Sequence, residues 1–111
     1  MKQQNLGTAK PVEAFAGVFR RTLAYNDAAM LCQFEIKKGA TLPMHHHDPV
    51  QIGICLTGRV RFLAENPADE FEATPGDGYV IASNQIHGLE AIEDSTYIEV
   101  FCPSRPEYAD F

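Results

Sequence analysis

Apolar and polar residues alternate along much of this chain, a pattern that is typical of β-strands with one buried face. Residues 29–37 show it most clearly, because Met30, Cys32, Phe34 and Ile36 fall on one face and polar residues follow on the other. Alternation and intervening turn residues predict strands over residues 29–37, 41–47, 50–56, 59–64, 70–73, 79–82, 88–92 and 96–102. No long segment has the periodicity of an amphipathic helix.

Turn-forming residues separate these segments about every ten residues, which predicts an all-β fold, either an antiparallel sandwich or a barrel. The Thr57-Gly58 turn predicts that residues 59–64 run back antiparallel to residues 50–56. Residues 1–13 are polar and predict an N-terminal arm, and residues 14–111 predict a single domain. The end of the chain after Cys102 is too rich in proline to continue a central strand.

Composition narrows the range of functions. The chain has 111 residues and a formal net charge of −6, which argues against nucleic acid as a partner. Residues 1–5 lack the apolar run that is typical of a signal peptide, and no stretch approaches the length of a membrane span, so we expect a cytoplasmic protein. Its three cysteines, Cys32, Cys55 and Cys102, form no CxxC pair and are expected to be buried free thiols.

The four histidines are the strongest chemical signal. His45 and His47 point to the same face of an extended strand, and His46 points away from them. With the amide oxygen of Gln51 and the distant His87, they form a candidate cage for a divalent metal such as Zn, Ni, Fe, Mn or Co. The alternative is that His45 and His47 form a surface cluster and His87 is a core residue.

Two charged residues near the end of the chain suit catalysis. Glu99 shares a strand face with Tyr97 and Phe101, so it is a candidate general acid or base with a raised pKa, unless that face is solvated. Arg105 lies between two prolines and suits pairing with a substrate carboxylate, although a lone arginine is usually a surface residue.

Other side chains are expected to have structural roles. Arg59 and Arg61 alternate with apolar residues, which predicts a solvated sheet face or a subunit contact. Phe34, Ile36, Phe62 and Ile81 are expected in the core. Tyr25, Tyr79 and Tyr97 could line a cavity, but nothing in the sequence selects among them.

Glycine and histidine spacing in two blocks resembles the cupin signature. The first block contains, in order, Gly39, His45, His47, Gln51 and Gly58, and most cupins have Glu where this chain has Gln51. The second runs from Pro75-Gly76-Asp77 to His87, with Ala82, Asn84 and Ala91 where the family usually has Pro, Gly and Asn. The resemblance implies a double-stranded β-helix, a small jelly-roll barrel, with the metal in its mouth.

A narrower resemblance rests on Gln51 of the candidate ligand set together with residues 91–95 and 99–105. These look like the pectin-degradation cupins, which open the ring of 4,5-unsaturated uronic acids to linear keto-uronates. The resemblance implies that Glu99 and Arg105 are catalytic, with Glu99 in place of the usual Asp, and that Phe101 and Arg105 bind the anionic sugar substrate. By analogy with cupins of this size we also expect a homodimer.

Two other functions are compatible with the same residues. The chain could be a different metal-dependent cupin enzyme, either a polyketide-cyclase-like protein, which can also use three His and one Gln, or a dioxygenase. It could also be a non-enzymatic module that binds a small ligand. The sequence shows no DNA-binding helix-turn-helix pattern, which argues against a transcription factor.

Overall fold

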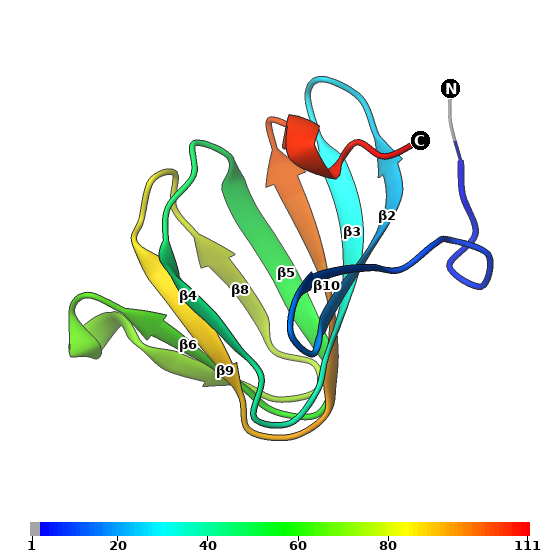
Figure 1. Ribbon diagram of the computed structural model, residues 1–111. Coiled ribbons are helices and arrows are strands. Elements are labelled where there is room, and N and C mark those ends of the chain that lie inside the picture. The colour runs from blue at the N-terminus through cyan, green and yellow to red at the C-terminus, as the bar shows by residue number, and fades with distance from the viewer. Residues whose placement is uncertain (1–2) are drawn as a thin grey trace.

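The computed structural model describes residues 3–111, which form ten β-strands and two single-turn 3-10 helices (Figure 1). The strands are β1 (Val12–Phe15), β2 (Val18–Tyr25), β3 (Met30–Ile36), β4 (Thr41–His45), β5 (Val50–Thr57), β6 (Val60–Ala64), β7 (Phe71–Ala73), β8 (Gly78–Ile81), β9 (His87–Ala91) and β10 (Ser95–Cys102). The helices are η1 (Pro67–Asp69) and η2 (Pro106–Tyr108). The predicted all-β fold is confirmed. Among the described residues, no helix is long and apolar enough to cross a membrane.

The strands form two antiparallel sheets that face each other across the core (Figure 1). The larger sheet has the order β1-β2-β3-β10-β5-β8, and the smaller has the order β4-β9-β6-β7. Aromatic side chains fill the space between them: Phe34 stacks on Tyr97 with ring centroids 5.2 Å apart, and Phe62 approaches from the smaller sheet. The sheets diverge toward the top of Figure 1, where the β4–β5 and β8–β9 connections and η2 lie.

Two strands at one side of the larger sheet have no clear signal in the sequence. β1 is mostly exposed. In β2 the inward positions are Val18, Arg20 and Thr22, and because two of these are polar the strand shows no apolar–polar alternation. The last two residues of the expected arm, Val12 and Glu13, lie in β1 and pair with β2. The first two residues of that arm lie outside the described residues, and the division into arm and domain stays a prediction.

The hairpin expected between residues 50–56 and 59–64 is wrong. β5 pairs with β10 and β8, whereas β6 pairs with β9 and β7 in the other sheet. Gly58 does turn the chain, with φ of +82°, but the turn carries it from one sheet to the other. The turn residues specify that the chain changes direction, but they do not specify which strand pairs with β5. That strand is β10, which pairs with β5 from Val50 to Thr57.

Most side-chain orientations follow the predicted alternation. Phe34, Ile36, Phe62 and Ile81 are buried, as expected. Arg59, just before β6, and Arg61, on β6, form ion pairs with acidic residues on or next to β7, which agrees with a solvated sheet face. Cys32 and Cys55 are buried free thiols, but the prediction is wrong for Cys102. Cys102 is exposed because it ends β10 on the strand's outer face.

The crossing at Gly58 generates a testable prediction. A Cβ atom at Gly58 would overlap the carbonyl oxygen of Asp94 and the hydroxyl of Ser95, whereas one at Gly39, where φ is +84°, would meet nothing within 4 Å. We expect Gly39→Ala to lower the free energy of unfolding by about 1 kcal/mol because of its backbone conformation alone. Gly58→Ala should lower it by about 3 kcal/mol, since overlap is added. Urea denaturation measures both losses, and equal losses would contradict the explanation.

Candidate metal centre

Three imidazoles meet between the sheets at the divergent end of the barrel. His45 ends β4 and is the register partner of His87, which begins β9. His47 follows two residues after His45, in the connection to β5. The candidate ligand atoms of the three side chains all lie within 4.8 Å of one another. His46 is exposed and contacts Asn84 instead, so it points away from the cluster, as expected.

Backbone carbonyls decide which nitrogen of each neutral imidazole carries the proton. Each Nδ1 lies at hydrogen-bond distance from a carbonyl oxygen, which can only accept, so each Nδ1 carries the ring proton and donates it. The bonds join His45 to Pro43 (2.9 Å), His47 to Pro49 (2.8 Å) and His87 to Gln85 (2.7 Å). The Nε2 atoms therefore keep their lone pairs. Burial lowers the pKa of His47 and lowers that of His87 to about 4, which favours the neutral rings that bind metals.

Gln51 completes the set of candidate donors. It lies on β5, is buried, and places its Oε1 3.0 Å from Nε2 of His47. When the ring proton of His47 is on Nδ1, Nε2 and Oε1 are both acceptors and repel each other. A cation between them would stabilise the short distance. Three imidazole nitrogens and one carboxamide oxygen suit a divalent first-row transition metal. The residues present therefore fit the kind of ion that the sequence predicted.

The same carboxamide connects the imidazole cluster to Glu99. The Nε2 group of Gln51 donates a hydrogen bond to Oε2 of Glu99, and the hydroxyl of Tyr79 donates to the same oxygen at 2.8 Å. Glu99 lies on β10 and is only 2 % exposed. Burial raises the pKa of Glu99 to about 7, although both hydrogen bonds and the positive charge of Arg105 oppose the rise. Glu99 therefore has the buried orientation expected from the sequence, and this burial is the cause of its raised pKa.

Arg105 reaches the same region from the segment after β10. Its guanidinium carbon lies 5.1 Å from the ring centroid of Phe101 and 4.2 Å from that of Tyr108, so the cation stacks on two aromatic rings. Its Nε donates to the carboxylate of Glu107 at 2.8 Å. The side chain is only 14 % exposed, so Arg105 does not have the ordinary surface position that the sequence left open.

The C-terminal segment that carries Arg105 is fastened to β2. Arg20 is buried, and its Nη1 donates to the carbonyl oxygen of Tyr108 at 3.2 Å and pairs with the carboxylate of Asp110 at 3.1 Å. The hydroxyl of Thr22 donates to the same carbonyl at 2.7 Å. Arg20 and Thr22, which interrupt the apolar alternation of β2 in the sequence, therefore fix the position of Tyr108, on which Arg105 stacks.

One narrow cavity joins these groups. Gln51, Glu99 and Arg105 line it together with His45, His87 and apolar side chains from both sheets. Its volume is about 30 Å³, which accommodates an ion or one or two water molecules. Pockets for small molecules usually measure about 300–1,000 Å³. A cavity of this volume is too small to enclose a sugar.

Three tyrosines at or beside the site could not be selected from the sequence. Burial and the neighbouring carboxyl of Glu99 raise the pKa of Tyr79, so its hydroxyl stays protonated and donates to Glu99. Tyr79 follows a glycine-rich turn at an inward strand position, which is a weak signal. Tyr108 lies in the proline-rich end of the chain, where no strand pattern indicates which way a side chain points. Tyr97 is buried and lines the cavity.

Comparison with known proteins agrees with this fold. A family model described as "Cupin domain" matches residues 32–102. The "Pectin degradation protein KdgF" of Dickeya dadantii (strain 3937) is 28% identical to this chain over an alignment of 94 residues that covers 83% of this chain and 84% of that relative.

Solved structures show the same arrangement. The structure of KdgF from Halomonas sp. is similar to this chain with a TM-score of 0.86 and 25% identity, covering 96% of this chain and 97% of that one. The polyketide cyclase RemF from Streptomyces resistomycificus is similar with a TM-score of 0.81 and 21% identity, covering 96% of this chain and 82% of that one. At that lower identity the likeness shows a shared fold alone.

Proposed function

The chain belongs to the cupin family, and from this premise we propose that it is a metal-dependent enzyme that opens the ring of 4,5-unsaturated uronic acids to linear keto-uronates. The observation that carries the proposal is that a buried carboxyl, Glu99, and an arginine, Arg105, line the same cavity as two of the clustered histidines. Similarity to two proteins named KdgF, one of them a pectin degradation protein, supports this substrate class.

His45, His47, Gln51 and His87 would hold the metal. When bound, the ion supplies a positive charge that polarises substrate oxygens. All four ligands are neutral, so they leave the full charge of the ion available to an anionic substrate. A Glu at position 51 would reduce that charge, and it could not donate to Glu99 as the amide of Gln51 does.

The reaction needs a held carboxylate and a group that moves protons. Arg105 would pair with the uronate carboxylate, and Phe101 would form the apolar wall beneath it. Glu99 would take the proton from the hemiacetal hydroxyl and return it to the ring oxygen as the ring C–O bond breaks, which gives an aldehyde and an enol. The enol then loses its O–H proton and gains a proton on carbon to become the ketone. The sum is an isomerisation, so no co-reactant is required.

Removing either proposed catalytic group should abolish the acceleration of ring opening. We expect Glu99→Gln to lower the rate by about 10²–10⁴-fold, the usual contribution of a placed proton-transfer group. Arg105→Ala should lose substrate binding as well, and both variants should keep their bound metal. The decrease in ultraviolet absorbance of an unsaturated uronate measures the rate. Arg61→Ala, on the outer sheet face, is the control, and full activity in both test variants would refute the assigned roles.

The ligand set predicts metal content independently of activity. His47→Ala removes one of the proposed metal ligands. Loss of a residue that only hydrogen-bonds to a ligand typically lowers metal affinity by roughly 10–100-fold, so loss of the ligand itself should lower the affinity of the protein for the metal by more. His46→Ala removes the adjacent, exposed imidazole and should retain the wild-type amount. Elemental analysis of both purified proteins tests this difference. Equal metal content in the two variants would exclude the proposed ligands.

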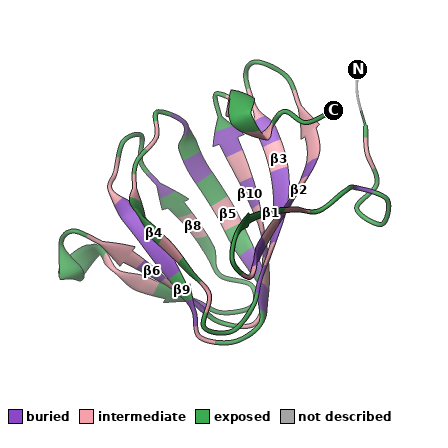
Figure 2. Cartoon of the chain, in the orientation of Figure 1, coloured by how far each residue is buried: buried purple, intermediate pink, exposed green. Residues whose placement is uncertain are grey.

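We also propose that two copies of the chain pair through the outer face of β5 and β8. Val50, Ile52, Ile54 and Leu56 alternate along β5 and are exposed, and Val80 lies beside Ile52 on β8 (Figure 2). Exposed aliphatic residues gathered on one face favour an interface. An uncharged face can pack against its own copy about a two-fold axis, whereas a face rich in one charge would repel it.

A charge on this face should therefore change the oligomeric state. We expect the wild-type protein to be a dimer and Ile52→Glu to be a monomer, because two like charges would then meet near the symmetry axis. Glu72→Gln, on the outer face of the smaller sheet, should leave the dimer intact. Light scattering coupled to size-exclusion chromatography measures the three masses. A monomeric wild-type protein at micromolar concentration would contradict the proposal.

A further inference from the structure

Three neighbouring strands place Glu99, Gly53 and Tyr79 in one row across the larger sheet. Gly53 on β5 is the register partner of Glu99 on β10 and also of Tyr79 on β8. Adjacent strands lie about 4.8 Å apart, so the backbones of Tyr79 and Glu99 are separated by about 10 Å. Yet the hydroxyl of Tyr79 donates to Oε2 of Glu99 at 2.8 Å, so the side chain of Tyr79 crosses the whole width of β5.

This crossing is possible because Gly53 has no side chain. A Cβ atom at Gly53 would lie 2.7 Å from the hydroxyl oxygen of Tyr79 and 2.8 Å from the ring carbon that carries it. The same Cβ atom would lie 2.7 Å from the backbone carbonyl oxygen of Ile98 on β10, so any other residue at position 53 would displace the tyrosine hydroxyl or the strand itself. The glycine opens a gap on the inner face of the sheet, and the tyrosine fills it.

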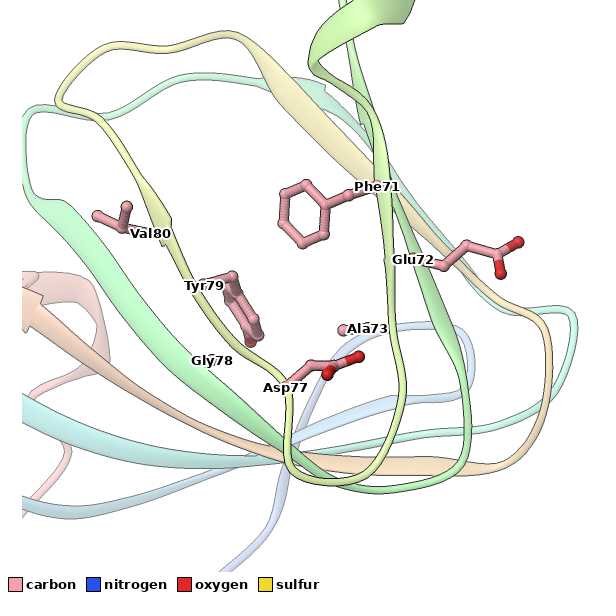
Figure 3. Close-up of a pocket in the computed structure, with 7 residues that line it drawn as sticks. All are labelled: Phe71, Glu72, Ala73, Asp77, Gly78, Tyr79 and Val80. Atoms are coloured by element: carbon pink, nitrogen blue, oxygen red, sulfur yellow. The ribbon is translucent and has the colours of Figure 1, made fainter.

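Aromatic packing holds the ring of Tyr79 in this gap. Its centroid lies 4.6 Å from that of Phe62 and 5.8 Å from that of Phe71, both on the smaller sheet. Figure 3 shows Phe71 and Tyr79 turned into the space between β7 and β8, where they line a side cavity of about 400 Å³. Glu99 lines the metal-centre cavity instead, so Tyr79 stands between the two cavities.

The two oxygens of Glu99 have different surroundings. Oε2 accepts hydrogen bonds from both Gln51 and Tyr79. Among residues 3–111, no group donates a hydrogen bond to Oε1. Oε1 is also not among the atoms that are completely buried without a partner, so it remains accessible. Since the carboxyl group lines the metal-centre cavity, Oε1 is the oxygen that remains available there.

We propose that Tyr79 is a positioning residue, which together with Gln51 holds Oε2 of Glu99 so that Oε1 exchanges the proton with the substrate. The inference rests on the proposed function of Glu99 and adds to it the reactive atom and the residue that orients it. Tyr79 does not line the metal-centre cavity, so it acts through Glu99 rather than by touching the substrate.

Tyr79→Phe tests the proposal, because it removes the hydroxyl and keeps the ring between Phe62 and Phe71. We expect kcat for the unsaturated uronate to fall roughly 10–100-fold, as for a misplaced catalytic group. KM, bound metal and melting temperature should stay close to the wild-type values. A wild-type kcat, or a loss of kcat that is matched by loss of metal or of folding, would overturn the positioning role.

A matched control removes a hydrogen bond between side chains of the same sheet, on its outer face, where β5 pairs with β10. The hydroxyls of Thr57 and Thr96 lie 2.8 Å apart on the exposed face of the sheet. Thr57→Val should keep the wild-type kcat. If Thr57→Val lowered kcat as much as Tyr79→Phe does, the effect would come from general loosening of the larger sheet and the proposal would fail.

A crystal structure of Tyr79→Phe separates this inference from the proposed function. If the wild-type protein shows no activity on unsaturated uronates, the proposed function fails, but the orientation of Glu99 can still be compared. A carboxyl group that has rotated from its wild-type position would support positioning by Tyr79. A carboxyl group that keeps the wild-type orientation without the hydroxyl would overturn it, whatever the substrate.

Discussion

The site depends on the two contacts made by the carboxamide of Gln51. Its oxygen faces the imidazole of His47, and its nitrogen donates to Glu99, so one side chain joins the imidazole cluster to the buried carboxyl. A carboxylate at this position could accept at both places but could not donate, and it would add a second negative charge beside Glu99. A neutral amide is compatible with both neighbours at once.

Burial makes such pairing necessary, because a polar group removed from water without a partner is strongly destabilising. Glu99 and His87 are both buried between the sheets, and both have hydrogen-bond partners. Burial shifts the two pKa values in opposite directions, up for the carboxyl and down for the imidazole, since it disfavours the charged form of each. The aromatic core therefore determines the chemistry of the polar groups inside it.

Several elements escaped sequence analysis for identifiable reasons. β2 was missed because its inward positions include Arg20 and Thr22, whose polar groups bind the C-terminal segment instead of water. The β5–β6 hairpin was wrongly expected because a glycine turn at Gly58 looks the same whether the chain folds back or crosses to the opposite sheet. Most strands and the inward positions of the candidate donors were predicted correctly, because strand alternation is a local property.

The sequence by itself determined eight of the ten strands that residues 3–111 form, where the chain turns, and that Glu99 faces the interior. These features depend on neighbours in the chain, through the two-residue period of a strand and the backbone freedom of glycine. Only the tertiary structure decided that β5 lies between β10 and β8, and that Tyr79 crosses Gly53 to reach Glu99. Contacts between residues distant in the chain depend on how the strands pair and the sheets pack, and no local pattern specifies that pairing.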